Sequence, residues 1–525
     1  MARPGILLLT VLGLLLASCS DSGGASSGHT KEPASSAPAA ASVGVPPAPG
    51  PPAPASTPAP DGYKLLKTSP ESGLVGTSFT ITGDALPANK AVQFVWVTED
   101  GSYNMDVLPD TVKFNERKFV ERRVLIPPSS GSAVVGKEGH LTVAFVAPAD
   151  YGGIHDIYAV VDGQEVGKAG YLLNRDVTIS PSSGPIGTPI SINVRGLGWK
   201  PWESTMALLW DNKYTGFLAA TTTRGNVVGQ IRATGPVGKH TMDIGAASAA
   251  VPYLNFEQSP VSAFPRYRFE FTVTADKGAP AATLDWPDEI YLVANPTAKT
   301  TVSADASFAA GVSASLAPNR GPVRSTVNLQ ATGLPAGTPV ELAWVTTVGN
   351  RNNPSGWALK ELPLGQATTG NDRTLTTSIQ VPDDLGGWHA LRLRQGGNVL
   401  AEAPYFVERS LVAVTPARVK PGADFTVEMK GYGWTELDNG AAVVYDNSYI
   451  GYACGFNSQG DITLHMVASM TPGTHLIDIY PMIYQGQGKP PWSYELPILG
   501  FRQDAPGLSL GYRLPAYRLA IEVVR

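Results

Sequence analysis

The sequence predicts an all-β protein built from several tandem domains, and three observations lead to this prediction. Gly (56 residues) and Pro (45 residues) together make up about a fifth of the 525 residues, well above average usage. Charged residues are only 16%, so the chain lacks the Glu- and Lys-rich composition of helical proteins. Hydrophobic residues reach 43%, enough to build cores, and at roughly 150 residues per domain the length corresponds to three or four domains.

The first nineteen residues look like an export signal. Arg3 precedes an apolar run from 6 to 16, which is too short to span a bilayer as a helix. The run ends in Leu16-Ala17-Ser18-Cys19, which resembles the lipobox of bacterial lipoproteins. The resemblance implies that residues 1–18 are removed and that acyl chains on Cys19 hold the protein on a membrane. An ordinary secretory signal with a chance cysteine is the alternative.

The segment that follows is predicted to be a disordered tether. From Ser20 to Asp61 it has no aromatic residue and ten prolines, so it cannot bury enough apolar surface to fold. We therefore expect residues 19–61 to consist of the lipidated cysteine and an extended linker. The expected location is the cell envelope: the outer membrane in a Gram-negative source, otherwise the outer face of the plasma membrane.

Four copies of one pattern make up the rest of the chain. Each copy opens with a proline- and glycine-rich stretch and continues into alternating apolar and polar residues, at 79–83, 190–196, 327–333 and 425–431. This alternation is typical of a half-buried strand, and a glycine closes each one. Each copy then has an apolar strand with an aromatic residue near its end: Trp96, Trp210, Trp344 and Tyr445. A later strand in each begins with glycine and histidine: His155, His240, His389 and His475.

These features resemble immunoglobulin-like β-sandwiches, and the opening motif is similar to the IPT/TIG group among them. The resemblance covers most of the chain after residue 62. It implies four tandem sandwich domains, and it is hardly specific for function, because such modules serve as spacers, binders and enzyme accessories.

The four copies form a duplicated pair of domains. The first resembles the third in Trp96-Val97-Thr98 and Trp344-Val345-Thr346, and the second resembles the fourth in Trp210-Asp211-Asn212 and Tyr445-Asp446-Asn447. We name them A (62–175), B (176–280), A′ (311–409) and B′ (410–525). The connector at 281–310 has no counterpart, and we expect an edge strand near 289–293. In domain A we expect a turn at 99–101.

The search for chemistry finds little. The net charge of −5 argues against a nucleic-acid partner. The sequence carries no HExxH, CxxC or GxSxG pattern, so no catalytic residue, metal or cofactor is predicted. The four histidines are expected to be structural corners that hydrogen-bond to backbone, with a metal or catalytic role as the alternative. The Asp-Asn pairs at 211–212 and 446–447 are expected to be hairpin turns, with a ligand for sugar hydroxyls or Ca²⁺ as the alternative.

Aromatic residues in the B domains are the candidate binding surface. They cluster near irregular loops, which are a common location for binding residues on a rigid sandwich. The candidates are Trp434, Tyr449, Tyr452, Tyr484, Trp492 and Tyr494 in B′, and Tyr253 and Phe256 in B. Packing between domains is the alternative use of these side chains.

Three functional hypotheses follow. The favoured one is a lipid-anchored, non-enzymatic surface protein that binds a glycan or an envelope or extracellular protein through the B-domain aromatics. The second is an architectural spacer or scaffold in which the aromatics join the domains. A carbohydrate-active enzyme is the third, and it would need two facing carboxylates that the sequence does not nominate.

Overall fold

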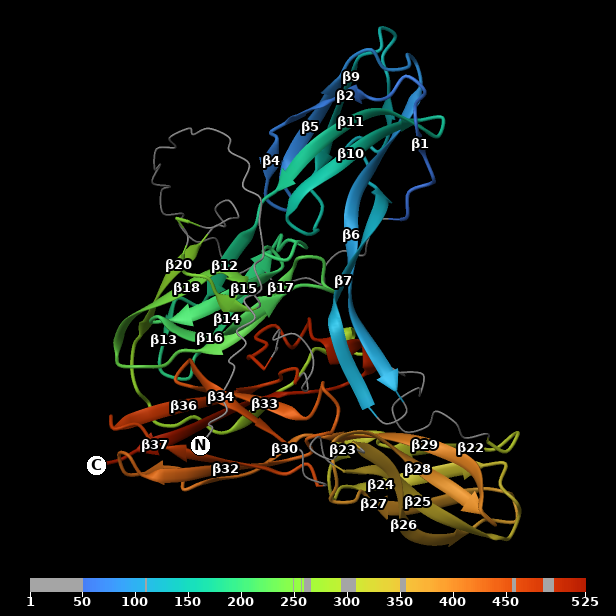
Figure 1. Cartoon of the computed structure of the whole chain (residues 1–525), viewed down its shortest axis with the longest axis vertical. Coiled ribbons are helices and arrows are strands. Elements are labelled where there is room, and N and C mark those ends of the chain that lie inside the picture. The colour runs from blue at the N-terminus through green and yellow to red at the C-terminus, as the bar shows by residue number, and fades with distance from the viewer. Residues whose placement is uncertain are drawn as a thin grey trace, which may run out of the picture. The chain divides into compact units, whose positions relative to one another are not determined.

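The four copies fold into four immunoglobulin-like β-sandwiches in a computed structural model of the chain (Figure 1). The structure describes residues 51–108, 111–248, 250–255, 257–258, 266–293, 308–349, 356–455, 459–484 and 495–525. All of them belong to one compact unit, Val45–Arg525. Within these ranges the chain forms strands and two short 3₁₀ helices but no α-helix.

Domain A pairs a three-stranded sheet, β3-β5-β9, with a larger sheet in the order β1-β11-β10-β6-β7. Its strands are β1 (Thr57–Pro58), β2 (Lys64–Leu65), β3 (Lys67–Ser69), β4 (Ser72–Gly73), β5 (Ser78–Gly83), β6 (Ala91–Leu108), β7 (Thr111–Leu125), β8 (Ala133–Val134), β9 (Leu141–Val146), β10 (Gly153–Val161) and β11 (Gln164–Leu173). Alternate residues of β5 and β9 face the core, as the period-2 pattern predicts.

Domain B repeats this arrangement with the sheets β12-β14-β17 and β13-β20-β18-β15-β16. Its strands are β12 (Asp176–Ser180), β13 (Ser183–Gly184), β14 (Pro189–Arg195), β15 (Thr205–Trp210), β16 (Lys213–Ala219), β17 (Val227–Arg232), β18 (Gly238–Ser248), β19 (Val251–Pro252) and β20 (Tyr267–Val273).

Domain A′ has the sheets β22-β24-β27 and β23-β29-β28-β25-β26. Its strands are β22 (Ser313–Ala317), β23 (Arg320–Pro322), β24 (Thr326–Thr332), β25 (Pro339–Gly349), β26 (Trp357–Thr368), β27 (Leu375–Gln380), β28 (Gly387–Gln395) and β29 (Asn398–Glu408).

Domain B′ has the sheets β30-β32-β35 and β21-β37-β36-β33-β34, in which β21 (Thr283–Asp285) comes from the connector. Its elements are β30 (Ser410–Thr415), β31 (Arg418–Val419), β32 (Asp424–Lys430), β33 (Gly440–Tyr445), β34 (Ser448–Cys454), β35 (Ile462–Val467), β36 (Gly473–Tyr480), the 3₁₀ helix η2 (Pro506–Leu510) and β37 (Ala516–Val523). The X-Pro bond that opens each of the four domains is cis, at Pro70, Pro181, Pro318 and Pro416. All four domains share the strand order of their sheets, as expected of four copies of one pattern.

The connector contributes its edge strand earlier than expected. Strand β21 (Thr283–Asp285) pairs antiparallel with β37 of B′, and the residues predicted as a strand instead form the 3₁₀ helix η1 (Glu289–Tyr291). The prediction of an added edge strand was right in kind and wrong in position. Two ion pairs hold this part of the connector against B′: Asp285 binds Arg518, and Asp288 binds Arg502.

Two further expectations for domain A are wrong. The last eleven residues of the predicted tether, 51–61, are ordered against the sandwich: β1 pairs parallel with β11, and Pro52 bridges Val124 of β7. A proline-rich segment is already extended and can pair along the margin of a sheet. Residues 99–101 form no turn but lie in the middle of β6, which continues to Leu108 as half of a long hairpin.

That hairpin reaches beyond its own sandwich. Val112 and Phe114 of β7 are 1% and 0% exposed, and they belong to the hydrophobic core of domain B together with residues of B′. The backbone N–H of Phe114 donates to Glu436 of B′, 2.8 Å away. Domains A, A′ and B′ each have a separate core, whereas the core of B is continuous with its neighbours.

Candidate functional site

The histidines of domains A and A′ are structural. His155 Nδ1 lies 2.8 Å from the carbonyl oxygen of Val97, and its Nε2 lies 2.7 Å from that of Tyr151. His389 repeats both contacts with Val345 and Leu385, at 2.9 and 2.8 Å. Each ring therefore lies between two backbone carbonyl oxygens, which can accept a hydrogen bond from an imidazole N–H. The expected backbone-bonded corner is confirmed.

In each A domain an aspartate binds the tryptophan that stacks on the histidine. The Trp96 indole N–H donates to Asp150 at 2.9 Å, and the Trp344 indole N–H donates to Asp384 at 3.0 Å. Trp96 stacks on His155 and Trp344 stacks on His389. This buried group explains why an aspartate stands shortly before a pair of glycines in both A domains, at 150–153 and 384–387.

The histidines of the B domains use a carboxylate as well as a carbonyl. Nδ1 of His240 lies 2.6 Å from Asp211, and Nδ1 of His475 lies 2.6 Å from Asp446. Their Nε2 atoms face the carbonyl oxygens of Pro236 and Thr471. Burial lowers the pKa of His475, but the hydrogen bond and charge of Asp446, with smaller contributions from Thr471 and Asp276, raise it above its ordinary value overall.

The two aspartates are also turn residues, as predicted. Asp211 and Asn212 have φ values of 48° and 63°, and Asp446 and Asn447 have 47° and 57°, which are left-handed conformations that Asp and Asn tolerate. The sequence showed the turns but not the Asp–His pairs, because the partners are about thirty residues apart. In the part of the chain that the structure describes, no group of three or more His, Cys, Asp or Glu side chains could hold a metal.

Trp434 is not a surface residue. It is 1% exposed and packs with Val345, Trp357 and Leu385 of A′ in a small cluster between A′ and B′. Its assignment to a ligand-binding surface is therefore wrong, because no ligand could reach the ring without separating the two domains. Nothing in its local sequence distinguishes this position from an exposed loop residue.

The other candidate aromatics have different surroundings. Tyr449 is part-buried against domain B, with its ring 6.3 Å from that of Tyr214 and its hydroxyl donating to the Glu495 carbonyl. Tyr452 is 47% exposed, and its ring centre lies 6.1 Å from that of Tyr484. Tyr253 is half-buried. Cys19, Phe256, Trp492 and Tyr494 lie outside the described residues.

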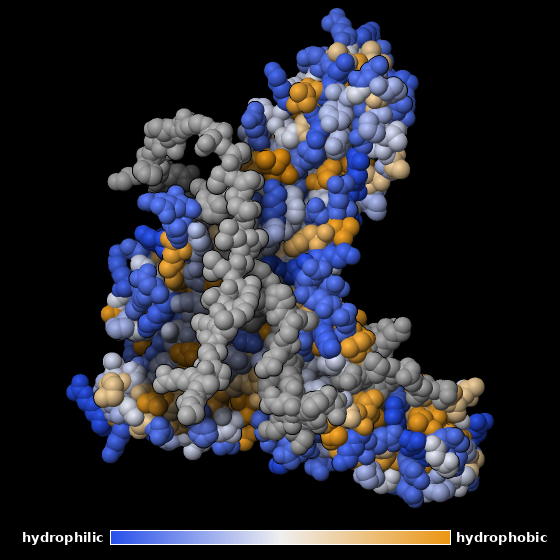
Figure 2. All heavy atoms as spheres, in the orientation of Figure 1, coloured by the Kyte–Doolittle hydropathy of each residue, from blue (hydrophilic) through white to orange (hydrophobic). Residues whose placement is uncertain are grey.

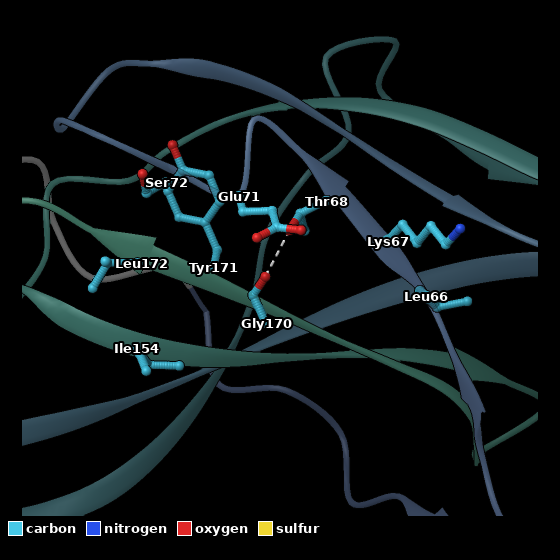
Figure 3. Close-up of a pocket in the computed structure, with 9 residues that line it drawn as sticks. All are labelled: Leu66, Lys67, Thr68, Glu71, Ser72, Ile154, Gly170, Tyr171 and Leu172. Atoms are coloured by element: carbon cyan, nitrogen blue, oxygen red, sulfur yellow. Dashed lines mark hydrogen bonds between the residues drawn. The ribbon is translucent and has the colours of Figure 1, made fainter. Parts of the chain in front are cut away.

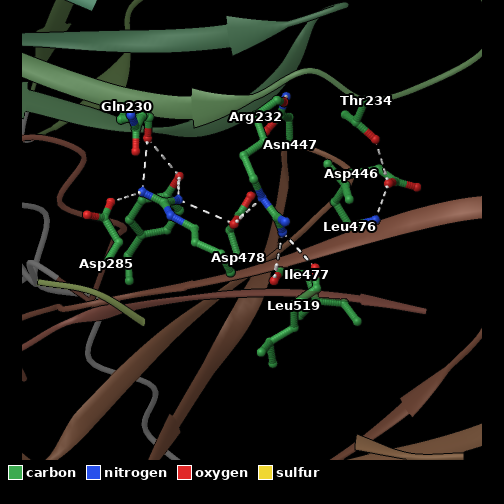
Figure 4. Close-up of polar contacts among 12 residues, drawn as sticks. Gln230, Arg232, Thr234, Asp285, Asp446, Asn447, Leu476, Ile477, Asp478 and Leu519 are labelled. Carbon is green, nitrogen blue, oxygen red and sulfur yellow. Dashed lines mark hydrogen bonds and ion pairs between the residues drawn. The ribbon is translucent and has the colours of Figure 1, made fainter. Parts of the chain in front are cut away.

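The B and B′ domains meet through a buried ion network (Figure 4). Arg232 at the end of β17 donates to Asp478 of β36 at 2.9 Å and to the carbonyl of Leu519 at 2.6 Å. Arg518 of β37 lies 3.3 Å from the same aspartate, and its guanidinium also binds Asp285 of the connector. The side chains of Arg232, Asp478 and Arg518 are 6%, 2% and 6% exposed.

Further contacts surround this network. Asn447 donates to the carbonyl of Arg232, and Thr234 donates to Asp446, so the B′ turn itself is held by domain B. The hydroxyl of Tyr480 donates to the Gln230 carbonyl, and burial raises the pKa of Tyr480 to about 12. The loop before β37 also packs on B, because the Leu499 N–H donates to the carbonyl of Phe217 at 2.9 Å.

Asp504 in this loop joins three domains. Its carboxylate accepts hydrogen bonds from the backbone N–H groups of Thr221 and Thr222 in B, and from the hydroxyl of Tyr103 in the A hairpin. Its side chain is buried. No local pattern in the sequence indicates this role of Asp504, because its partners lie hundreds of positions away.

Comparisons with known proteins identify no family. No family model and no curated protein matches the chain. Solved structures with similar folds include the four-domain D1–D4 ectodomain fragment of ICAM-5, at 11% identity and a TM-score of 0.17, covering 88% of this chain and 99% of that one. Salmonella alpha-2-macroglobulin is similar at 7% identity and a TM-score of 0.17, covering 88% of this chain.

The chain spans only 30% of the length of that alpha-2-macroglobulin. Because the TM-scores are this low, no conclusion about this chain is drawn from these structures. The fold class is assigned from the strand order described above. No helix in the described ranges is long and apolar enough to cross a bilayer.

Proposed function

We propose that this chain is a non-enzymatic protein of the cell envelope, anchored by a lipid on Cys19, whose main role is architectural. The observation that carries the proposal is the buried contact of Arg232 with Asp478 between B and B′. Charged groups are buried in protein contacts only when they are paired, because removing them from water is costly. Such a contact holds the duplicated units together as one body instead of as independent modules on flexible linkers.

The contacts made by the histidines, the aspartates and Trp434 support the same proposal. Their polar atoms are occupied by hydrogen bonds inside or between domains, and the indole of Trp434 is used for packing. These are the residues that a metal site, a catalytic site or an aromatic binding surface would have required.

The experiment is Asp478→Asn in the full chain. Removing the charge leaves Arg232 buried without its carboxylate partner, which should cost about 3–5 kcal/mol of stability. In scanning calorimetry, the unfolding transition that B and B′ share should split in two or move to a much lower temperature. Asp243→Asn is the matched control, because Asp243 is the equivalent carboxylate of domain B and pairs with the more exposed Arg266. An Asp478→Asn chain that melts like the wild type would overturn the architectural role.

Ligand binding through B′ is a second candidate, favoured by the Tyr452–Tyr484 pair. Tyr452 is the exposed member, and Glu495 lies close enough to raise the pKa of its hydroxyl, although burial is the larger cause. Two tyrosines beside a carboxylate could bind a glycan by stacking and hydrogen bonding. Tyr452→Ala should then abolish capture on a glycan array or by an envelope protein, and Ile450→Ala on the same strand should not. Equal capture by both variants would end this candidate.

A further inference from the structure

The large sheets of A and A′ each carry a cross-strand apolar pair at equivalent positions, and among the described residues only the A′ pair is covered. In A′, Trp388 of β28 lies opposite Phe406 of β29, and they are 3% and 1% exposed. In A, Ile154 of β10 lies opposite Leu172 of β11 in the same register, and they are 65% and 40% exposed.

In A′ the cover is a segment of B′ around η2. The Trp388 indole N–H donates to the carbonyl of Leu510 at 3.0 Å, and the Phe406 ring meets the Tyr512 ring edge-on at 5.7 Å. Arg513, the next residue, binds Glu408 at 2.9 Å. An aromatic residue followed by an arginine thus seats on this face of the sandwich.

In A the same position is a groove of about 440 Å³ (Figure 3). Leu172 and Ile154 lie at one end, Gly170 forms the middle of its floor, and Leu66 and Lys67 lie at the other end. A Cβ added at Gly170 would meet nothing within 4 Å, so the floor is open. Aliphatic side chains here leave unfilled the space that an indole and a phenyl ring occupy in A′.

Glu71 adds a charge to the groove. Its backbone carbonyl accepts from the Leu172 N–H at 3.0 Å, which places the residue beside the apolar pair. Its carboxylate has no hydrogen-bond or ion-pair partner in the described ranges. On the face drawn in Figure 2, apolar side chains otherwise reach the surface in small separate groups. Large exposed apolar side chains next to a pocket mark an interaction site.

We propose that this groove on domain A binds a peptide segment of a partner protein that presents an aromatic side chain followed by a basic one. The aromatic ring would fill the space above Ile154 and Leu172, and the basic residue would pair with Glu71, as Tyr512 and Arg513 do with Phe406 and Glu408 in A′. This goes beyond the architectural role, since it assigns a partner to a surface that the B–B′ contact does not use.

The probe is a fluorescent peptide with the sequence of residues 503–515, which contains Tyr512 and Arg513. In the full chain the A′ face is already covered, so binding reports on A. We expect saturable binding by anisotropy, weakened at least about tenfold by Ile154→Ser with Leu172→Ser. Both residues are exposed, so the variant should fold. Glu71→Lys in the protein should weaken binding of the wild-type peptide, and a peptide that carries Tyr512→Ala should not bind.

Val146→Ser is the matched control, because Val146 is 53% exposed on β9 of the same domain. It should leave the affinity unchanged. Absence of saturable binding, or equal binding by the groove variant, would overturn the proposal. Sedimentation at several concentrations tests the other occupant: a dimer that Ile154→Ser abolishes would assign the groove to a second copy of the chain and overturn the partner peptide. Because Asp478 is untouched, failure here leaves the architectural proposal standing.

Discussion

Trp199 of domain B lies with its indole centre 5.2 Å from the imidazole of His155 in domain A. Trp434 of B′ and His389 of A′ repeat the contact at 5.4 Å. The corner histidine of each A domain therefore also contacts a tryptophan of the domain that follows it. Because the contact is present in both halves of the duplication, it defines A–B as the repeated structural unit.

Trp434→Ala should loosen A′ from B′. Truncating a buried indole typically costs about 3–5 kcal/mol, because the cavity does not collapse fully. Calorimetry should show a lower melting temperature, and limited proteolysis should cut near the A′–B′ boundary. Tyr452→Ala, at a largely exposed ring of the same domain, should change stability by less than about 0.5 kcal/mol. An unchanged melting temperature for the tryptophan variant would contradict its role in joining the domains.

The stability of B′ should fall as the pH rises above neutrality. The pKa of His475 is raised in the folded state, so the folded protein holds its proton where the unfolded chain has lost it. The stabilisation is complete below the unfolded pKa of about 6.5 and is lost as the pH passes the folded value. Melting curves from about pH 6 to about pH 9 should therefore show the advantage of wild type over His475→Gln shrinking.

His140 provides the control for this titration. It is exposed and pairs with Asp84, which is also exposed. His140→Gln should follow the wild-type pH profile, because a contact between two exposed side chains adds little stability. If the difference in melting temperature between wild type and His475→Gln stays constant over this pH range, the contact with Asp446 does not depend on the proton of His475.

Metal removal should have no effect, whereas removal of a corner histidine should. Both nitrogens of His389 lie within hydrogen-bond distance of carbonyl oxygens in the core, so His389→Ala removes a buried hydrogen-bond partner and should cost about 1–3 kcal/mol. Thermal melts with and without EDTA should superimpose. A large drop in melting temperature with EDTA would mean that the histidines are ligands.

Cys19→Ser tests the membrane anchor. If the lipid on Cys19 is the sole attachment, this variant should leave the detergent phase in a phase-partitioning assay, or remain as the uncleaved precursor. Cys454→Ser is the control, since Cys454 lies at the end of β34 inside B′. Partitioning of the Cys19 variant identical to wild type would rule out the lipid anchor.

The sequence predicts the repeated sandwich well because the signals are local. The alternation in β5, β14, β24 and β32 and the Asp-Asn turns are read within about ten residues. The position of Trp434 and the partners of Asp504 depend on surfaces that come together only in the folded chain. The β6–β7 hairpin misleads for a similar reason: Glu99-Asp100-Gly101 has the composition of a turn, yet these residues continue as strand because they pair with β7.

The hairpin of domain A also has a consequence for the order of synthesis. Val112 and Phe114 leave the ribosome with the first domain, but the Glu436 carboxylate that binds the Phe114 amide is made more than 300 residues later. During that interval the hairpin tip lacks part of its burying surface. At roughly 5–20 residues per second, the delay lasts roughly tens of seconds, and during it an apolar strand end is open to association with other nascent chains. Completion of the last domain is thus the step that makes the first one safe from aggregation.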